Sequence, residues 1–379
     1  MMKIGMMTFH ASYNCGSMLQ AYALQQTLIR KYDSKVEIID YSNWHQRNMY
    51  NLFDMRPNKN ALKYDLAILP HINIMKKLRA DYKNFLKTQL ILSPKRYTRW
   101  SQLPGVEKDY DMLIAGGDQV WNIRCRDHDD AYYLNFANNI RKVAYSPSLG
   151  AQNVLEHAQN PKIYRQYLDD FESLSVREGN GQKWLQELTD RKVPIIADPT
   201  LLLTSEEWKE WLPLEEIDGK YIFNYAFYHN RPETNRAISE ISKKLNMPVY
   251  TIDYKSWCLY KLTDYGIQKY KNAGPIAMIS LMKNASLVLT QSFHGTLFAA
   301  MFGKPFWSYH APKINNPNDD RATYLLNQLG LVERYVVIDE LINRDDLLKG
   351  YNTSAVNQNI KNMREKAFLY IDSFMQKEI

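Results

Sequence analysis

The chain has 379 residues, 45% of them hydrophobic and 23% charged, which is the composition of an ordinary soluble globular protein. Two domains are expected, because a single hydrophobic core rarely grows to this length. The net charge of +7 is dispersed, without a block of lysine or arginine, so the sequence disfavours nucleic acid as a partner. This mild positive excess suits an anionic substrate or a loose encounter with an anionic membrane surface.

The three cysteines are far apart and form no CxxC pair, which argues against a disulfide framework or a zinc site and favours a reducing cytosol. The longest apolar runs are shorter than the roughly 18–20 residues that span a bilayer. Residues 1–10, MMKIGMMTFH, lack the apolar core and cleavage site of a signal peptide and are typical of a first strand. We therefore expect a cytoplasmic protein.

The opening of the chain predicts a parallel α/β sheet. A buried strand at Lys3–Phe9, a helix from about Ser17 to Lys31 and a strand at Val36–Asp40 form a strand–helix–strand unit. Asn14 and Gly16 stand at the start of this helix, where free N–H groups favour an anion. One glycine is a weak signal for such a site, so helix capping by Asn14 stays open as the alternative.

Residues 41–101 are polar and aromatic and do not follow the α/β alternation. Apolar side chains recur at helical spacing between Ala61 and Leu90, with an interruption at Pro70, so a packed helical excursion is predicted. We expect it to cover the sheet or to line the mouth of the cleft.

The remaining strands of the first domain end in polar residues, as expected when their carboxyl ends face one crevice. The first of them leads into two glycines and a loop that combines hydrogen-bonding groups with one large aromatic face. The predicted elements are strands at Asp111–Ala115, Val143–Tyr145, Leu174–Val176 and Val193–Ala197 and a helix at Gln182–Leu188.

A second α/β series follows a short tryptophan-containing helix, and the domain boundary is placed near Leu212. This divides the chain into a domain at 1–212, a domain at 213–345 and a terminal segment at 346–379 whose helix is expected to pack back on the first domain. The segment His310–Asp320 is expected to form a mobile loop over the site. The predicted elements are strands at Tyr221–Phe227, Pro248–Ile252, Leu287–Leu289, Pro305–Tyr309 and Tyr335–Ile338 and helices at Pro232–Leu245, Pro275–Asn284, Arg321–Leu329 and Val356–Gln376.

The stretch Ser286–Phe306 is the centre of the predicted site. A strand turns sharply into an apolar helix, with His294 and Gly295 at the helix N-terminus. The helix dipole and the free N–H groups favour an anion there, and Gly295 would let a ligand approach the backbone. The prediction is a site for phosphate or carboxylate, to which His294 adds a directed donor.

Five groups of motifs resemble, in order, those of the polysaccharide pyruvyl transferase family. They are Asn14-x-Gly16 with Leu19–Leu24 and Ile39–Tyr41, Gly117–Asn122, Ser175-x-Arg177-Glu178, Asp198-Pro199-Thr200 and Ser292–Gly295. The resemblance implies transfer of the enolpyruvyl group of phosphoenolpyruvate to two hydroxyls of a cell-surface polysaccharide sugar, giving a cyclic pyruvate ketal. It also implies two Rossmann-like domains in a glycosyltransferase B-like arrangement, with the donor side in the second domain, the acceptor side in the first, and no obligatory metal or further cofactor.

The resemblance also implies roles for individual residues. The donor would be held by Arg177, Ser292, His294, Gly295, Arg321 and Lys304, and the acceptor by Asn14, Gly16, Gln119, Trp121 and Asn122. His294 would serve as acid or hydrogen-bond donor, and Asp118 as general base for the sugar hydroxyl. Structural alternatives stay open: His294 as a packed cap, Asp118 as the residue that fixes its own loop, and Trp121 as a core side chain.

One position departs from the family pattern. Many members carry arginine two residues before the histidine, and here that residue is Ser292, so a bidentate guanidinium for phosphate is missing from the turn. Arg321, Lys304 or Lys313 must compensate, or the donor is a different molecule. Two rival functions stay open, a glycosyltransferase with a nucleotide-sugar donor and a non-catalytic binding protein that kept the fold. The oligomeric state, the acceptor sugar and peripheral membrane contact through a lipid-linked acceptor also stay open.

Overall fold

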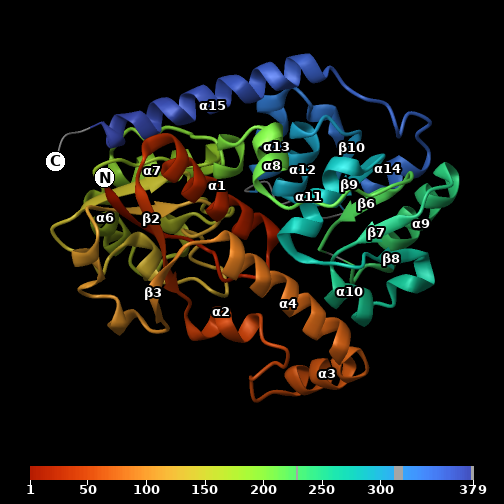
Figure 1. Cartoon of the computed structure of the whole chain (residues 1–379), viewed down its shortest axis with the longest axis horizontal. Helices are drawn as coiled ribbons and strands as arrows, with labels where there is room; N and C mark the ends of the chain where they lie inside the picture. Colours follow the sequence, from red (N-terminus) through yellow and green to blue (C-terminus); the bar gives the residue numbers. More distant parts are fainter. Residues whose placement is uncertain (228, 311–318, 377–379) are drawn as a thin grey trace.

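Two parallel β-sheets organise the computed structural model, which describes residues 1–227, 229–310 and 319–376 (Figure 1). The strand order is β3-β2-β1-β4-β5 in the first sheet and β11-β10-β9-β6-β7-β8 in the second. In each sheet the chain builds one half outward from a central strand and then returns to build the other half. This is the Rossmann-like order, in which ligands bind beyond the carboxyl ends of the strands where the order reverses. The predicted two-domain α/β class is confirmed.

The first sheet is buried on both faces, and its register is set by apolar residues. Ile4 of β1 lies opposite Val36 of β2 and Met112 of β4, and all three are at most 2% exposed. The strands are β1 (Lys3–Met7), β2 (Lys35–Tyr41), β3 (Leu92–Tyr97), β4 (Met112–Gly116) and β5 (Arg141–Tyr145). The helices of this half are α1 (Cys15–Tyr32), α2 (Trp44–Met49), α3 (Lys59–Ile68), α4 (Ile72–Gln89), α5 (Val154–His157), α6 (Pro161–Asp169), α7 (Gly179–Thr189) and α8 (Ser205–Trp211).

The second sheet is built in the same way, and local signals fix several of its helices. Pro232 opens α9, and Gly330 ends α13 in the left-handed conformation (φ 74°). The strands are β6 (Ile222–Tyr225), β7 (Val249–Thr251), β8 (Ile267–Lys269), β9 (Leu287–Thr290), β10 (Phe306–His310) and β11 (Tyr335–Val337). The helices are α9 (Pro232–Leu245), α10 (Tyr254–Leu259), α11 (Gly274–Asn284), α12 (Phe293–Met301), α13 (Arg321–Leu329), α14 (Ile338–Ile342) and α15 (Thr353–Met375).

Short 3₁₀ helices connect these elements. They are η1 (Leu69–His71), η2 (Trp100–Gln102), η3 (Val106–Asp109), η4 (Asp130–Tyr133), η5 (Pro199–Leu202), η6 (Leu262–Tyr265) and η7 (Val332–Arg334). The predicted interruption at Pro70 is such a turn, because η1 separates α3 from α4. The predicted strands at 174–176 and 193–197 are wrong as regular strands. They are reduced to the isolated bridges Val143–Ser173 and Val176–Ile195.

One hydrophobic core joins the two halves. It contains Leu24 of α1, Trp208 of α8 and Phe298 of α12, each fully buried. The Trp208 ring lies between Tyr22 of α1 and Phe298, with centroid distances of 5.8 and 5.2 Å. This packing holds α1 and α12 together, so their N-termini point into the same interdomain space.

The terminal helix α15 runs along both halves (Figure 1). Tyr370 donates to the carbonyl of Ala144 at 2.8 Å in the first domain, and Asn359 donates to the carbonyl of Leu329 at 3.1 Å in the second. None of the helices in the described part of the chain has the length and apolar character needed to cross a bilayer. Residues 311–318, which include Lys313 and most of the predicted mobile loop, lie outside the described residues.

Candidate functional site

Two helix N-termini meet in the space between the domains. Asn14 caps α1 and accepts from the Gly16 N–H at 3.0 Å, while Ser292 caps α12 and accepts from the Gly295 N–H at 3.3 Å. The His294 ring lies directly on Gly16, where an added Cβ would stand 2.1 Å from His294 Nδ1. A histidine of the second domain thus packs on the first helix of the first domain, and the positive ends of two helix dipoles converge beside it.

His294 belongs to a buried charge cluster that crosses the interface. Its Nε2 lies 3.4 Å from Asp198 Oδ2, and Arg177 Nη1 donates to the same oxygen at 2.7 Å. The guanidinium of Arg177 also stacks over the Phe293 ring at 4.2 Å. The three side chains are at most 8% exposed. Asp198 Oδ2 is therefore shared between one ring nitrogen of His294 and the Arg177 guanidinium.

The Asp198 carboxylate is the counter-ion of this cluster. Burial acts to raise its pKa, but the charge interaction and hydrogen bond with His294, together with the Arg177 guanidinium, outweigh burial and hold the pKa well below its usual range. Thr200 contributes two hydrogen bonds to Asp198 Oδ1, from its backbone N–H at 3.0 Å and from its hydroxyl at 2.6 Å. Asp198 is consequently a fixed negative charge.

Arg321 brings a further cation to the interface at the start of α13. It makes a bidentate pair with Asp319, with both N–O distances at 2.7 Å. Burial acts to lower the pKa of the Arg321 guanidinium, but Asp319 outweighs burial and the pKa is raised. The charges of Glu178 and Asp118 act in the same direction, so Arg321 lies within electrostatic reach of both acids.

Asp118 is engaged within its own domain. Its Oδ2 accepts a short hydrogen bond from the Ser17 hydroxyl on α1, and its backbone is left-handed (φ 52°). The side chain is 6% exposed. As a general base it would act from this buried position, against the first turn of α1.

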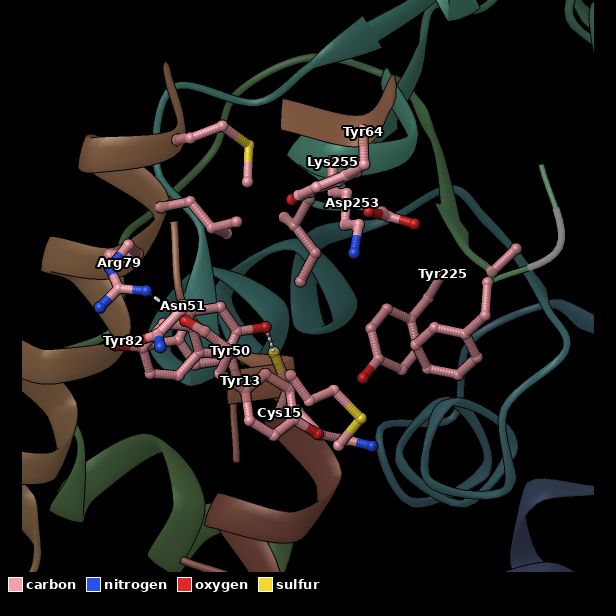
Figure 2. A pocket seen from close by; sticks show the side chains of 17 residues that line it. Tyr13, Cys15, Tyr50, Asn51, Tyr64, Arg79, Tyr82, Tyr225, Asp253 and Lys255 are labelled. Atoms are coloured by element: carbon pink, nitrogen blue, oxygen red, sulfur yellow. Dashed lines mark hydrogen bonds between the residues drawn. The ribbon is translucent and has the colours of Figure 1, made fainter. Parts of the chain in front are cut away.

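A separate pocket of about 290 Å³ opens between the domains beside this cluster (Figure 2). Its walls come from the start of α1, from the excursion that contains α2 to α4, and from the carboxyl ends of β6 and β7. Aromatic residues dominate, with cations at two points. The lining residues are Tyr13, Asn14, Cys15, Met49, Tyr50, Asn51, Tyr64, Met75, Leu78, Arg79, Tyr82, Tyr225, Ala226, Phe227, Ile252, Asp253 and Lys255.

The polar groups of the pocket are mostly neutral donors. Burial raises the pKa of the Cys15 thiol to about 12, and that thiol lies 3.1 Å from the Tyr82 hydroxyl. Burial likewise raises the pKa of Tyr82 and Tyr225 well above the ordinary value. Burial also lowers the pKa of Lys255, an effect that an anionic group bound nearby would reverse. Aromatic faces with neutral hydroxyls and a few charges suit a polar, ring-shaped ligand.

The pocket and the charge cluster share neighbouring residues. Asn14 and Cys15 line the pocket, and the next residue, Gly16, carries the His294 ring. Tyr225 also lines the pocket, and its ring lies 2.9 Å from the position of a Cβ added at Gly295. The two features therefore adjoin across the α1 N-terminus.

Several predicted site residues lie elsewhere or serve the fold. Trp121 is fully buried, donates to the carbonyl of Tyr132 at 3.1 Å and stacks on Tyr133, so a core role replaces the predicted sugar platform. Lys304 follows the C-terminal end of α12, and its N–H bonds the Ala299 carbonyl at 2.9 Å. The whole helix separates it from His294, so Lys304 is removed from the predicted donor set.

Three further predictions change for related reasons. Gln119 and Asn122 bond each other at 2.9 Å and close their own loop instead of facing the pocket. Gly295 is required for protein packing rather than ligand approach, because a Cβ there would stand 2.1 Å from Thr290 Oγ1. Of the predicted acceptor residues, Asn14 lines the pocket and Gly16 lies next to it.

Sequence reasoning missed most of the pocket wall. Tyr225 is the last residue of β6 and Asp253 follows β7, so the rule that ligands bind at carboxyl ends would have found them. Tyr13 lies between β1 and the predicted α1 cap, so the same rule would have found it. Arg79 and Tyr82 belong to the helical excursion that was predicted to cover the sheet or line the mouth of the cleft, and the pocket lining confirms this placement. The two residues were not singled out, because on α4 they stand at ordinary helical spacing.

Comparisons with known proteins agree with this architecture. No curated protein matches the chain. The family model described as polysaccharide pyruvyl transferase matches residues 14–309. Among solved structures, the S. aureus MnaA–UDP complex aligns with a TM-score of 0.54 at 12% identity, over 99% of this chain and 97% of that one. Anabaena Alr3699/HepE, in complex with UDP and glucose, aligns with a TM-score of 0.51 at 9% identity, over 99% and 100%. At these identities the structural matches show the shared two-domain fold alone.

Proposed function

Because the chain belongs to the polysaccharide pyruvyl transferase family, we propose that it transfers the pyruvyl group of phosphoenolpyruvate to a sugar of a cell-surface polysaccharide or its precursor. The observation that carries this proposal is that His294 of the second domain shares Asp198 with Arg177 of the first, beside a tyrosine-lined pocket, while Arg321 lies within electrostatic reach of Glu178. A small anion and a sugar could then be held next to each other.

The reaction sets clear demands on such a site. The methylene carbon of phosphoenolpyruvate takes up a proton, and the adjacent carbon becomes oxocarbenium-like. One sugar hydroxyl attacks that carbon and phosphate leaves with the bonding electron pair of its C–O bond. A second hydroxyl then closes the ketal. Of the two hydroxyl protons, one replaces the proton taken up by the methyl carbon and the other leaves on phosphate.

We assign the donor to the charge cluster. Arg177 and Arg321 supply fixed positive charge for carboxylate and phosphate, and the helix N-termini supply N–H groups. His294 is the proposed proton donor, since an incoming dianion favours its protonated form. Both arginines are already paired with carboxylates, so the donor must share them with Asp198 and Asp319.

We assign the acceptor to the tyrosine-lined pocket. Its aromatic faces can stack on a sugar ring, and its neutral hydroxyls can bind sugar hydroxyls. Asn14 stands where the pocket adjoins the cluster, so an acceptor hydroxyl near Asn14 would be close to the donor carbon. Asp118 keeps its proposed role as general base, acting through Ser17, which donates to it.

Ligand-induced stabilisation tests the donor assignment. At ten times its Kd, phosphoenolpyruvate is expected to raise the free energy of unfolding by about 1.4 kcal/mol, measured by thermal shift. Arg321→Ala should abolish this increment. Arg344→Ala is the matched control, because Arg344 makes the same bidentate contact with an aspartate two residues away, at 2.8 and 3.0 Å, far from the site.

The same experiment separates the rivals. Ser292, in place of the arginine common in the family, favours a different donor, and the two structural neighbours above were solved with UDP. Stabilisation by UDP but not by phosphoenolpyruvate would support a nucleotide-sugar enzyme. Stabilisation by neither ligand, together with no phosphate release from phosphoenolpyruvate across a panel of sugars, would support a non-catalytic protein.

Replacing Gly16 with alanine should displace His294 without altering any ionisable group. The new Cβ would stand 2.1 Å from Nδ1 and 2.5 Å from Cγ, so the ring must move. A shift of about 1 Å at a catalytic group costs about 10²-fold in rate. The rate of phosphate release is the readout. Gly350→Ala is the control, since no heavy atom lies within 4 Å of its added Cβ, and an unchanged rate in Gly16→Ala would contradict the proposed role of His294.

A further inference from the structure

The outer face of α3, with the first residue of η1, carries large apolar side chains that no described part of the chain covers fully. Leu62, Leu66 and Leu69 expose 61%, 58% and 49% of their surface. At about 100° per residue, the three lie within about 60° of one another around the helix axis. The buried Ala61 and Ile68 lie about 120° around the helix from the centre of these leucines, so α3 has a second apolar face that points to solvent. We call Leu62, Leu66 and Leu69 the leucine stripe.

Positive charge accompanies the leucine stripe. Residues 54–81 contain six lysines or arginines and three aspartates, and two of these cations, Arg56 and Lys77, pair with Asp54 and Asp81. Lys59 and Lys63 are exposed and lie about 60° and 100° around the helix from Leu62, on one flank of the stripe. The third aspartate, Asp65, accepts from the backbone N–H of Asp54 at 2.8 Å and is engaged in the fold.

The position of α3 relates the stripe to the pocket. In Figure 1, α3 lies at the outer end of the excursion, away from both sheets. Tyr64, on the same helix, lines the pocket and stacks under Lys255 of α10 at 4.5 Å. Arg79 of α4 lies on the pocket wall as well (Figure 2). The helix that presents the stripe to solvent is therefore also a wall of the pocket.

We propose that the leucine stripe with Lys59 and Lys63 docks the protein on the surface of an anionic lipid bilayer. Leucines inserted at the headgroup boundary, with lysines beside them on the phosphates, are the pattern of an interfacial amphipathic helix. The exposed flank formed by Lys59 and Lys63 favours lipid phosphates over a protein partner. Docking does not depend on the proposed function. The benefit of docking rests on the proposed function, because a sugar carried on a lipid would meet the pocket at the membrane surface.

Vesicle co-sedimentation with the full chain tests the docking. The protein should bind vesicles that mix phosphatidylcholine and phosphatidylglycerol, bind pure phosphatidylcholine weakly, and be released by salt. The double variant Leu62→Glu/Leu66→Glu should lose at least about tenfold in vesicle affinity, because each leucine contributes apolar burial and each glutamate repels the lipid. Replacing Lys59 or Lys63 with glutamine should cost about fivefold each.

Two variants on α15 serve as matched controls. Leu369 is 68% exposed on a helix far from α3, so Leu369→Glu should bind vesicles as the unaltered chain does, and Lys366→Gln is the corresponding control for charge. Thermal melting checks that all variants fold. The proposal is overturned if the unaltered chain does not bind anionic vesicles, or if the stripe variants bind equally well.

Light scattering tests whether a second copy of the chain, rather than a bilayer, covers the leucine stripe. If the chain is a dimer that Leu62→Glu/Leu66→Glu dissociates, and neither form binds vesicles, the stripe is an interface between copies and the proposal is overturned. Vesicle binding is measured without substrate, so failure of the proposed function would leave its result unchanged. Conversely, the stripe variants should retain phosphate release with a water-soluble acceptor.

Discussion

Replacing His294 with alanine is expected to lower the rate of phosphate release from phosphoenolpyruvate by about 10²–10⁴-fold, the usual contribution of a positioned acid or base. The reason is geometric. The ring is held between Gly16 and Asp198, with its Nε2 3.4 Å from Asp198 Oδ2, so the proposed proton donor has a fixed position at the domain interface. Single-turnover phosphate release is the measurement.

A structural role for His294 would give a different pattern. His294→Gln keeps a polar side chain of similar length, so it should fold normally but remain slow if proton transfer matters. His45→Ala is the control, because His45 is exposed on α2 and should leave the rate unchanged. If His294→Gln restores the rate, or if the rate loss in His294→Ala disappears at a temperature where both proteins are fully folded, His294 is a packing residue.

Replacing Asp198 with alanine is expected to destabilise the fold by about 3–5 kcal/mol, the cost of removing one partner of a buried ion pair. Asp198 is fully buried and faces Arg177 at 2.7 Å, so its loss leaves a buried guanidinium without its counter-ion. Denaturant unfolding measures the change. Asp345→Ala is the control, because Asp345 pairs with Lys244 while 99% exposed and such pairs contribute at most about 1 kcal/mol.

The pH dependence gives a second test of the same carboxylate. Its pKa is lowered in the folded state, so its stabilising contribution is fully present above its unfolded pKa of about 3.9 and is lost as the pH falls toward the folded value. The difference in free energy of unfolding between the unaltered chain and Asp198→Asn should therefore become smaller below about pH 4. A difference that stays constant from neutral to acid pH would contradict the charge assignment.

Local signals made much of the fold predictable. Pro232 at a helix start and Gly330 after a helix end gave α9 and α13 their exact limits, and the strand–helix alternation gave two parallel sheets. The edge strand β3 was missed because Pro94 interrupts its pattern, which an edge position tolerates.

The candidate site was only partly predictable, because it depends on which elements the fold brings together. His294 and Arg177 were found through motifs, and both meet Asp198, which the sequence analysis gave only as part of a family motif without a site role. Trp121 stands in a polar loop, where a tryptophan can stack on a sugar, but it packs against Tyr133 in the core. No local pattern distinguishes it from an exposed tryptophan, because burial is decided by distant parts of the chain.

The terminal helix α15 limits how the two domains can move. It is anchored to the first domain through Tyr370 and Arg364, which bonds the Leu201 carbonyl at 2.8 Å, and to the second through Asn359. Pulling the domains straight apart would break bonds at both ends of one rigid rod. A rotation of the domains about an axis close to α15 would keep these bonds, and it would open the far side of the interface, where α4 contacts α10, more than the side next to the helix (Figure 1).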